Sequence, residues 1–230
     1  MTRLLLIETS TELCSAALSE DERVICYRES SAPKAHAAMT AVYIKEILDS
    51  TGLSAAGCDG VCVSMGPGSY TGLRVGVSTA KGLCFGSGIP LLAVGTLDVL
   101  VWQAIIGQAL PEGCRYIIPM IDARRMEAYT AVFDTEGKQI RETRPEILSE
   151  DSFREYLNDG SVLFIGDAAG KASDVIVHPE AHFLNCCPKA SSMAIPALAE
   201  YKEKRFKDVA YFEPFYLKEF VATVSRKKLF

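Results

Sequence analysis

The stretch MGPGSYTGLRVGVSTAKGL, residues 65–83, decides the fold of this chain. A short apolar run at 60–64 reads as a strand, and residues 71–85 read as a helix that ends at Gly86. The glycine-rich loop 66–69 between them presents free backbone N–H groups at the positive end of a helix dipole. It is therefore either an anion site or a tight turn with Ser69 as the N-cap, and both interpretations stay open.

The neighbouring segments on either side predict a mixed α/β sheet. Upstream, residues 4–7, 14–18 and 24–27 read as an antiparallel meander, and a helix opened by Ser31 and Pro33 closes at Gly52. Downstream, residues 91–94 read as another strand. The order βββαβαβ indicates crossover helices on a mixed sheet.

The second half of the chain begins like the first. Ile121-Asp122 repeats Ile7-Glu8 at an offset of 114 positions (121 − 7), and in both cases an apolar strand ends in an acid before a short turn and a return strand. We therefore expect two lobes that share an ancestral hairpin. The predicted elements of the second half are strands at 116–121, 128–133, 142–148 and 162–165, helices at 150–157 and 193–204, and, because of Pro214, an extended segment at 211–220.

The composition describes an ordinary globular chain. Hydrophobic residues make up 49% and charged residues 23% of the 230 positions, and the net charge is −5. A protein that grips nucleic acid alone usually carries a basic face, whereas the one basic cluster here, 226–228, reads as a solvated tail. No apolar stretch approaches 18 residues and no signal region is evident, so we expect no membrane segment and a cytoplasmic location. The eight cysteines are expected to be free thiols that hold no metal.

Three motifs together resemble one protein family. Residues 65–83, LIETSTELCSAAL at 6–18 and IDARRMEAYTAVF at 121–133 are similar to the TsaB family, also called YeaZ, of the actin-like superfamily. The resemblance is strong over about the first 135 residues and continues loosely through GDAAGK and DVAYFEPFYLK. It implies a two-lobed α/β fold of the actin-like (ASKHA, ribonuclease H-like) type. Residues 1–100, joined by part of the C-terminal segment, would form a lobe with a mixed five-stranded sheet, and residues 101–230 a smaller, degenerate lobe.

The resemblance also implies a function without chemistry of its own. Members of this family are scaffolds that bind the transferase TsaD, help to recruit the ATPase TsaE and meet tRNA only through the complex, which puts threonylcarbamoyl groups on adenosine. In TsaD a pair of histidines four residues apart holds a metal, and Thr96 and Leu100 stand at those positions here. His178 and His182 have that spacing, but Pro179 favours a loop. We therefore expect neither catalytic residues nor a metal site.

Members of the actin-like superfamily bind the phosphates of ATP between two hairpins. The resemblance implies that this chain has lost part of that nucleotide site. In the second lobe the turn 123–125 lacks the small residues that allow close phosphate approach, and its arginines either bind an anion or are solvated. We expect no cofactor in the isolated chain, and ATP or ADP only at a subunit junction. The candidate contacts for an anion or nucleotide are Thr9, Ser10, Thr11, Gly66, Gly68, Ser69 and Arg124.

The helix predicted over 34–50 is apolar on two sides, whereas a surface helix needs one apolar stripe. In the next helix, over 71–85, Gly72 and Gly76 are four residues apart and let another backbone come close. The resemblance implies that both helices dock on TsaD, or on a second copy of the chain when TsaD is absent; alternatively, both stripes serve the chain's own core. The residues expected at this interface are Met39, Tyr43, Ile47, Gly72 and Gly76.

Two enzymatic alternatives remain. A kinase of the superfamily would need a carboxylate that activates a hydroxyl, and Glu8 and Asp122 are the available ones. A peptidase of the M22 type, acting on the partner, would need a nucleophile such as Ser69 with a histidine base, and the sequence shows no evident base.

Overall fold

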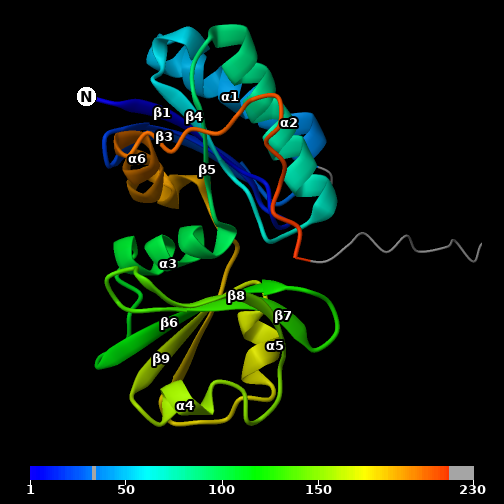
Figure 1. Ribbon diagram of the computed structural model, residues 1–230, viewed down its shortest axis with the longest axis vertical. Coiled ribbons are helices and arrows are strands. Elements are labelled where there is room, and N and C mark those ends of the chain that lie inside the picture. The colour runs from blue at the N-terminus through cyan, green and yellow to red at the C-terminus, as the bar shows by residue number, and fades with distance from the viewer. Residues whose placement is uncertain (33–34, 218–230) are drawn as a thin grey trace, which may run out of the picture.

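The computed structural model describes residues 1–32 and 35–217, which form two lobes, each built on a five-stranded sheet (Figure 1). The strand order is β3-β2-β1-β4-β5 in sheet one and β8-β7-β6-β9-β10 in sheet two. In each sheet the first three strands form an antiparallel meander, and the last two run parallel to the first. The strands are Arg3–Glu8 (β1), Cys14–Glu20 (β2), Arg23–Ser30 (β3), Gly60–Ser64 (β4), Leu91–Val94 (β5), Cys114–Asp122 (β6), Glu127–Phe133 (β7), Gln139–Ile147 (β8), Ser161–Gly166 (β9) and Ala181–Asn185 (β10).

Helices cover both faces of sheet one, which explains why its central strands β1 and β4 are almost wholly buried and apolar. On one face lie α1 (Ala35–Thr51) and α2 (Tyr70–Ser87), whose side chains join a single core cluster with Leu5 and Val63. On the other face lies α6 (Ala194–Lys202), packed on Leu4 and Leu6. Two short 3-10 turns, Ala55–Gly57 and Ala190–Ser192, complete this lobe.

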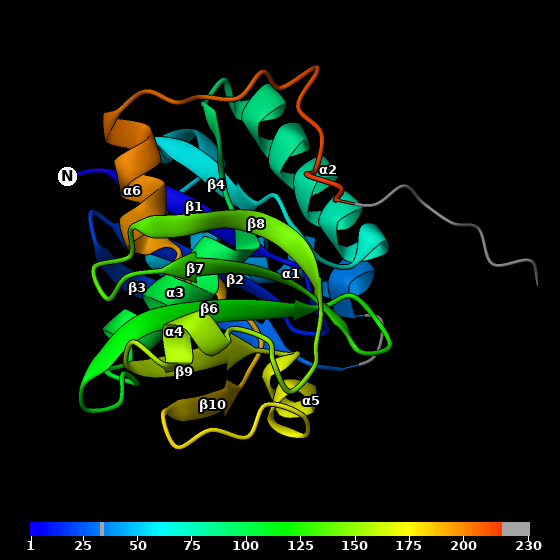
Figure 2. The same cartoon turned by 60° about the horizontal axis from the view of Figure 1, so that its bottom comes forward.

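One helix, α3 (Thr96–Ile106), lies between the two sheets (Figures 1 and 2). Val99 packs with Leu4 on the side of sheet one, whereas Leu100 and Val101 pack against sheet two. All three side chains are fully buried. The helix is therefore apolar around most of its circumference, as expected for a helix enclosed between two layers.

The second lobe has a complete sheet but very short helices on its outer face. There α4 (Arg154–Leu157) and α5 (Ala169–Ser173) cover Phe164 and Val162. The expected smaller, degenerate lobe is therefore reduced in its helices and not in its sheet. The helix predicted over 150–157 shrinks to its last turn, because Phe153 just before it adopts a positive φ of 60°.

The last described segment returns to the first lobe. We call residues 205–217 the C-terminal strap. Its backbone bonds to β5 (Lys207 N to Leu91 O, 2.8 Å) and to the loop after β4 (Phe215 N to Met65 O, 2.7 Å). The expectation of an extended segment packed on the body is confirmed up to residue 217; residues 218–220, the basic cluster at 226–228 and Pro33 lie outside the described residues.

Other expectations also have an outcome. The two-lobed α/β architecture is confirmed, and so are the paired hairpins. None of the eight cysteines forms a disulfide. The prediction of a loop around His178 and His182 is wrong for His182, which lies in β10. Within residues 1–32 and 35–217, no helix combines the length and the apolarity needed to cross a membrane.

Candidate functional site

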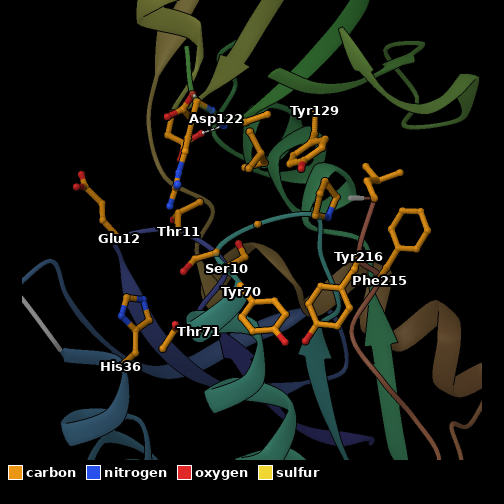
Figure 3. Close-up of a pocket in the computed structure, with 18 residues that line it drawn as sticks. Ser10, Thr11, Glu12, His36, Tyr70, Thr71, Asp122, Tyr129, Phe215 and Tyr216 are labelled. Atoms are coloured by element: carbon orange, nitrogen blue, oxygen red, sulfur yellow. Dashed lines mark hydrogen bonds between the residues drawn. The ribbon is translucent and has the colours of Figure 1, made fainter. Parts of the chain in front are cut away.

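A cavity of about 660 Å³ lies between the two lobes, at the ends of β1 and β6 (Figure 3). The first lobe contributes hydroxyl-bearing residues, the second lobe contributes carboxylates and an arginine, and the strap contributes aromatic rings. The residues that line it are Ser10, Thr11, Glu12, His36, Pro67, Gly68, Ser69, Tyr70, Thr71, Ile121, Asp122, Ala123, Arg124, Tyr129, Asp167, Phe215, Tyr216 and Leu217.

The glycine loop closes onto the β1–β2 turn, and this contact requires glycine at position 68. Ser69 N donates to Ser10 O at 2.6 Å, and a Cβ on Gly68 would lie 2.4 Å from the same oxygen. Ser69 is the N-cap of α2, because its hydroxyl accepts from Gly72 N at 3.3 Å. The interpretation as a capped turn is therefore confirmed, and the capped helix start faces the cavity.

The acid at the end of β1 does not reach the cavity. Glu8 is fully buried, and its Oε1 accepts from Ser10 N at 2.6 Å. Burial raises the pKa of this carboxyl, because the charged form loses its hydration. Glu8 therefore cannot activate a substrate hydroxyl as the kinase alternative would require, since no part of it is exposed.

The acids of the second lobe do face the cavity. Asp167 Oδ1 accepts from Asp122 N at 2.8 Å, and burial raises the pKa of Asp167 to about 6. Asp122 in turn accepts from Arg124 N at 3.0 Å and from the ammonium group of Lys171. Lys171 also donates to the carbonyl of Arg125 in the β6–β7 turn and to that of Glu127 at the start of β7, so it holds this wall in place.

The β6–β7 turn carries a backbone conformation that usually needs glycine. Arg124 and Arg125 have φ values of 69° and 51°, in the left-handed region. Neither residue has the small side chain that would let a phosphate approach the turn closely. The guanidinium group of Arg124 is the group of this turn that can reach an anion in the cavity.

Of the seven candidate contacts for an anion or nucleotide, the structure brings five to the cavity wall: Ser10, Thr11, Gly68, Ser69 and Arg124. The other two lie beneath it. Thr9 is fully buried and its hydroxyl donates to Gly72 O at 2.9 Å, and Gly66 packs under Phe215. These two residues shape the loop and are not placed to touch a ligand.

Sequence reasoning missed the aromatic lining and one histidine. His36, near the start of α1, lines the same cavity as Ser69, so the structure supplies a base candidate that the sequence did not indicate. Ser69, however, already uses its hydroxyl as a helix cap. Phe215 and Tyr216 come from the distant strap, and Tyr216 contacts Tyr70 with ring centroids 5.1 Å apart. Such long-range contacts leave no local signal in the sequence.

The interface residues expected on α1 need correction. Tyr43 is 8% exposed and Ile47 is fully buried, and both belong to the core cluster beneath α1, against which Met39 is also packed. Their stripe therefore serves the chain's own core. The solvent-facing stripe is the other one, with Ala38, Ala41 and Val42.

The two glycines expected at the interface also face inward. A Cβ on Gly72 would lie 2.0 Å from Thr9 O, and a Cβ on Gly76 would lie 2.3 Å from Thr9 Oγ1. They do allow a close backbone approach, but the approaching segment is the β1–β2 turn of the same chain. The glycines of α2 that face solvent are Gly82 and Gly86.

The positions compared with the metal-binding histidines are enclosed. Thr96 and Leu100 are both fully buried in α3. Within the part of the chain that the structure describes, no group of three or more His, Cys, Asp or Glu side chains is arranged to hold a metal ion. His178 Nδ1 accepts from Glu180 N at 3.2 Å, and His182 is exposed.

Comparison with known proteins gives consistent results. A family model described as TsaD, tRNA N6-adenosine threonylcarbamoyltransferase, matches residues 30–222. The tRNA threonylcarbamoyladenosine biosynthesis protein TsaB of Escherichia coli (strain K12) is 30% identical over an alignment of 230 positions, which covers 96% of this chain and 96% of that one. The protein of the same name from Bacillus subtilis (strain 168) is 29% identical over 167 residues, or 71% of this chain and 70% of that one.

Solved structures agree with these matches. YeaZ from Pseudomonas aeruginosa has a TM-score of 0.81 and 25% identity, with 94% of this chain and 100% of that chain covered. An inorganic polyphosphate/ATP-glucomannokinase from Arthrobacter sp. strain KM has a TM-score of 0.50 and 11% identity, over 89% of this chain and 100% of that one. The second likeness concerns the fold alone, and both confirm the actin-like class.

Proposed function

The chain belongs to the TsaB family of tRNA threonylcarbamoyladenosine biosynthesis proteins, and from this premise we propose that it is a non-catalytic subunit that docks on the transferase TsaD. In this proposal it also helps to recruit the ATPase TsaE and meets tRNA only within the complex. When TsaD is absent, the surface that docks on TsaD pairs instead with a second copy of the chain.

The observation that carries this proposal is the solvent-facing side of the α1–α2 pair. Phe85 on α2 is 85% exposed and Val42 on α1 is 41% exposed, although both lie on helices that already bury their other side in the core. The exposed positions of the two helices include several small residues, Ala37, Ala38, Ala41, Ser78, Gly82 and Gly86, and also the charged Lys45, Glu46 and Asp49 on α1. Small side chains allow the close approach of other helices, and covering the exposed ring of Phe85 would remove apolar surface from water and so stabilise a complex.

The family match supports TsaD as the occupant. The TsaD family model spans both α1 and α2 of this chain, so a TsaD subunit carries the corresponding helix pair. Two related helix pairs can meet face to face about a pseudo-two-fold axis, as the same patch does in a symmetric dimer. The same argument covers the homodimer.

The burial of the chemical positions supports a non-catalytic role. Glu8, Thr96 and Leu100 are enclosed by the core, so none of them can meet a substrate. The cavity itself keeps hydroxyl groups, a capped helix start and Arg124, which suit an anionic group. We therefore propose that ATP or ADP binds only in the assembled complex, at the subunit junction, where these groups of the cavity and the partner subunit would hold it together.

The proposal is tested by titrating purified TsaD into the chain and into the Phe85→Asp variant in a calorimeter. The buried charge should weaken binding by about 100-fold or more, because a desolvated carboxylate replaces an apolar contact. The matched control is Ile147→Asp on β8, a 74% exposed residue in the other lobe, which should bind like the unmodified chain.

Equal binding by Phe85→Asp and Ile147→Asp would exclude this face as the docking site. A transfer assay completes the test: the chain should modify tRNA only when TsaD is added, and modification by the chain alone would contradict the non-catalytic role. Tight binding of Mg-ATP by the isolated chain would favour the kinase alternative.

A further inference from the structure

The two most exposed aromatic side chains among the described residues lie around one lysine. Phe85 is 85% exposed and Tyr211 is 84% exposed, whereas the next, Tyr27, is 54% exposed. Phe85 follows Lys81 by one turn of α2, so the two are neighbours on the helix surface. Tyr211 lies directly between Ala210 and Phe212 of the strap, whose carbonyls both bind Lys81.

Lys81 fixes the strap beside α2. Its Nζ donates to Ala210 O and to Phe212 O, each at 3.0 Å. The strap runs along α2 in both views, and Arg74 Nε, two turns before Lys81, donates to the hydroxyl of Tyr216 at 3.3 Å (Figures 1 and 2). The strap therefore forms the border of the exposed α2 surface on the side away from α1.

The direction of Tyr211 is set by the residues around it. Asp208 Oδ1 accepts from Ala210 N at 2.7 Å and from Tyr211 N at 3.0 Å, which closes a turn. The next residue, Phe212, packs against the core cluster beneath α1 and α2. Because Phe212 points inward from this fixed turn, Tyr211 is held outward into solvent.

We propose that Phe85 and Tyr211 form one aromatic anchor, which inserts into the TsaD subunit and makes the strap part of the docking face. This inference rests on the proposed function and extends the face beyond the two helices. Aromatic residues with few rotatable bonds dominate the binding energy of interfaces when they are buried there. Here the turn at Asp208 and the bonds from Lys81 fix Tyr211 before binding, which lowers the ordering cost.

The anchor adjoins open space into which a partner can pack. A Cβ placed on Gly82 or on Gly86, on either side of Phe85 in the sequence, would meet no atom within 4 Å. The partner surface is therefore expected to supply an apolar pocket for the rings and a ridge that lies over the glycines. TsaD is the occupant because this surface is continuous with the face proposed above.

The experiment measures TsaD binding by Phe85→Ala, Tyr211→Ala and the double variant, with Tyr27→Ala as the matched control. Tyr27 is an exposed tyrosine on the edge strand β3, and its neighbour Cys26 packs beneath α1, so its ring points to the other face of sheet one. Each anchor variant should bind at least about tenfold more weakly, and Tyr27→Ala should stay within about twofold. The double variant should lose less than the product of the two single effects, because the rings act together.

Lys81→Met tests the positioning role. It should weaken TsaD binding about fivefold and speed amide exchange at residues 210–212, whereas a lysine that only solvates α2 would leave that exchange unchanged. Thermal midpoints of all variants, measured without TsaD, show that the chain remains folded.

The outcomes separate this inference from the proposed function. If Tyr211→Ala binds like Tyr27→Ala while Phe85→Asp still abolishes binding, the strap is not part of the face and the inference is overturned, but the docking role stands. If Phe85→Asp also binds normally, both fall.

Discussion

The two lobes have the same sheet and different helices. Strand order and direction agree throughout, yet the crossovers of the first lobe hold α1 and α2, with 17 and 18 residues, whereas those of the second lobe hold α4 and α5, with 4 and 5. A parallel crossover needs a covering element, and a short helix suffices for that. The extra length in the first lobe therefore covers more than the sheet requires and presents a second surface to solvent.

The largest effect should come from the glycines that bring each crossover close to the first hairpin. A Cβ on Gly72 of the first lobe would lie 2.0 Å from Thr9 O, and one on Gly166 of the second lobe would lie 2.0 Å from Met120 O. Alanine at either position should destabilise the chain by about 3 kcal/mol or more, as measured by urea denaturation, because backbone must move. Gly166→Ala should cost more, since its φ of 135° is also unfavourable for alanine.

Gly82→Ala is the control for this pair. It lies on the same helix as Gly72 but has no neighbour within 4 Å, so alanine should stabilise the isolated chain by about 0.5–1 kcal/mol. Equal losses at Gly72 and Gly82 would mean that α2 does not depend on the close contact with the hairpin.

An intermediate effect should come from the acids at the strand ends, which differ between the lobes. Glu8 is enclosed, whereas in the second lobe Asp167 lies at the cavity with its pKa raised by burial from 3.8 to about 6. Between pH 4 and 6 the folded chain therefore binds more protons at this site than the unfolded chain, and the contribution of Asp167 to stability falls as the pH rises through 6.

Asp167→Asn should remove the free-energy cost of ionising this buried carboxyl, and its side-chain oxygen should still accept the hydrogen bond from Asp122 N. We expect a gain of about 1–2 kcal/mol at pH 7 and a clearly smaller gain near pH 4.5, measured as denaturation midpoints across pH. A gain of the same size at both pH values would show that the charge of Asp167 is not the cause.

The smallest effect concerns the turns between the paired hairpin strands. The turn of the second lobe holds Arg124 at a positive φ, whereas none of the described residues 9–13 in the first lobe has one. Arg124→Gly should raise stability by up to about 1 kcal/mol, because glycine adopts this conformation without strain. Arg144→Gly in the regular strand β8 is the control and should destabilise the chain, so a loss in both variants would contradict strain at Arg124.

The same contrast explains what the sequence could predict. Strands with continuous apolar runs, such as β1 and β4, and the hairpin repeat at Glu8 and Asp122 have local signals, so the fold class was predictable. β10 and the shortened α4 were not, because a partly exposed strand and a turn fixed by Phe153 have weak periodicity.

The candidate site was predicted only in part, for a related reason. The loop and the hairpin residues share a local pattern, but Phe215 and Tyr216 reach the cavity from a strap far away in the sequence. On α1, two apolar stripes are equally plausible core faces in the sequence. Only the packing shows that Tyr43 and Ile47 face inward and Val42 outward.

The placement of α3 and the strap has a consequence for any attempt to divide the molecule. A fragment ending before α3 would lack α6 and the strap, which pack on sheet one, and a fragment starting at α3 would expose Val99 and the inner side of α6 to water. The segments that follow the second sheet, α6 and the strap, therefore complete the packing of the first lobe. Because each half would lose part of its packing on separation, heat should melt the two lobes as one cooperative unit.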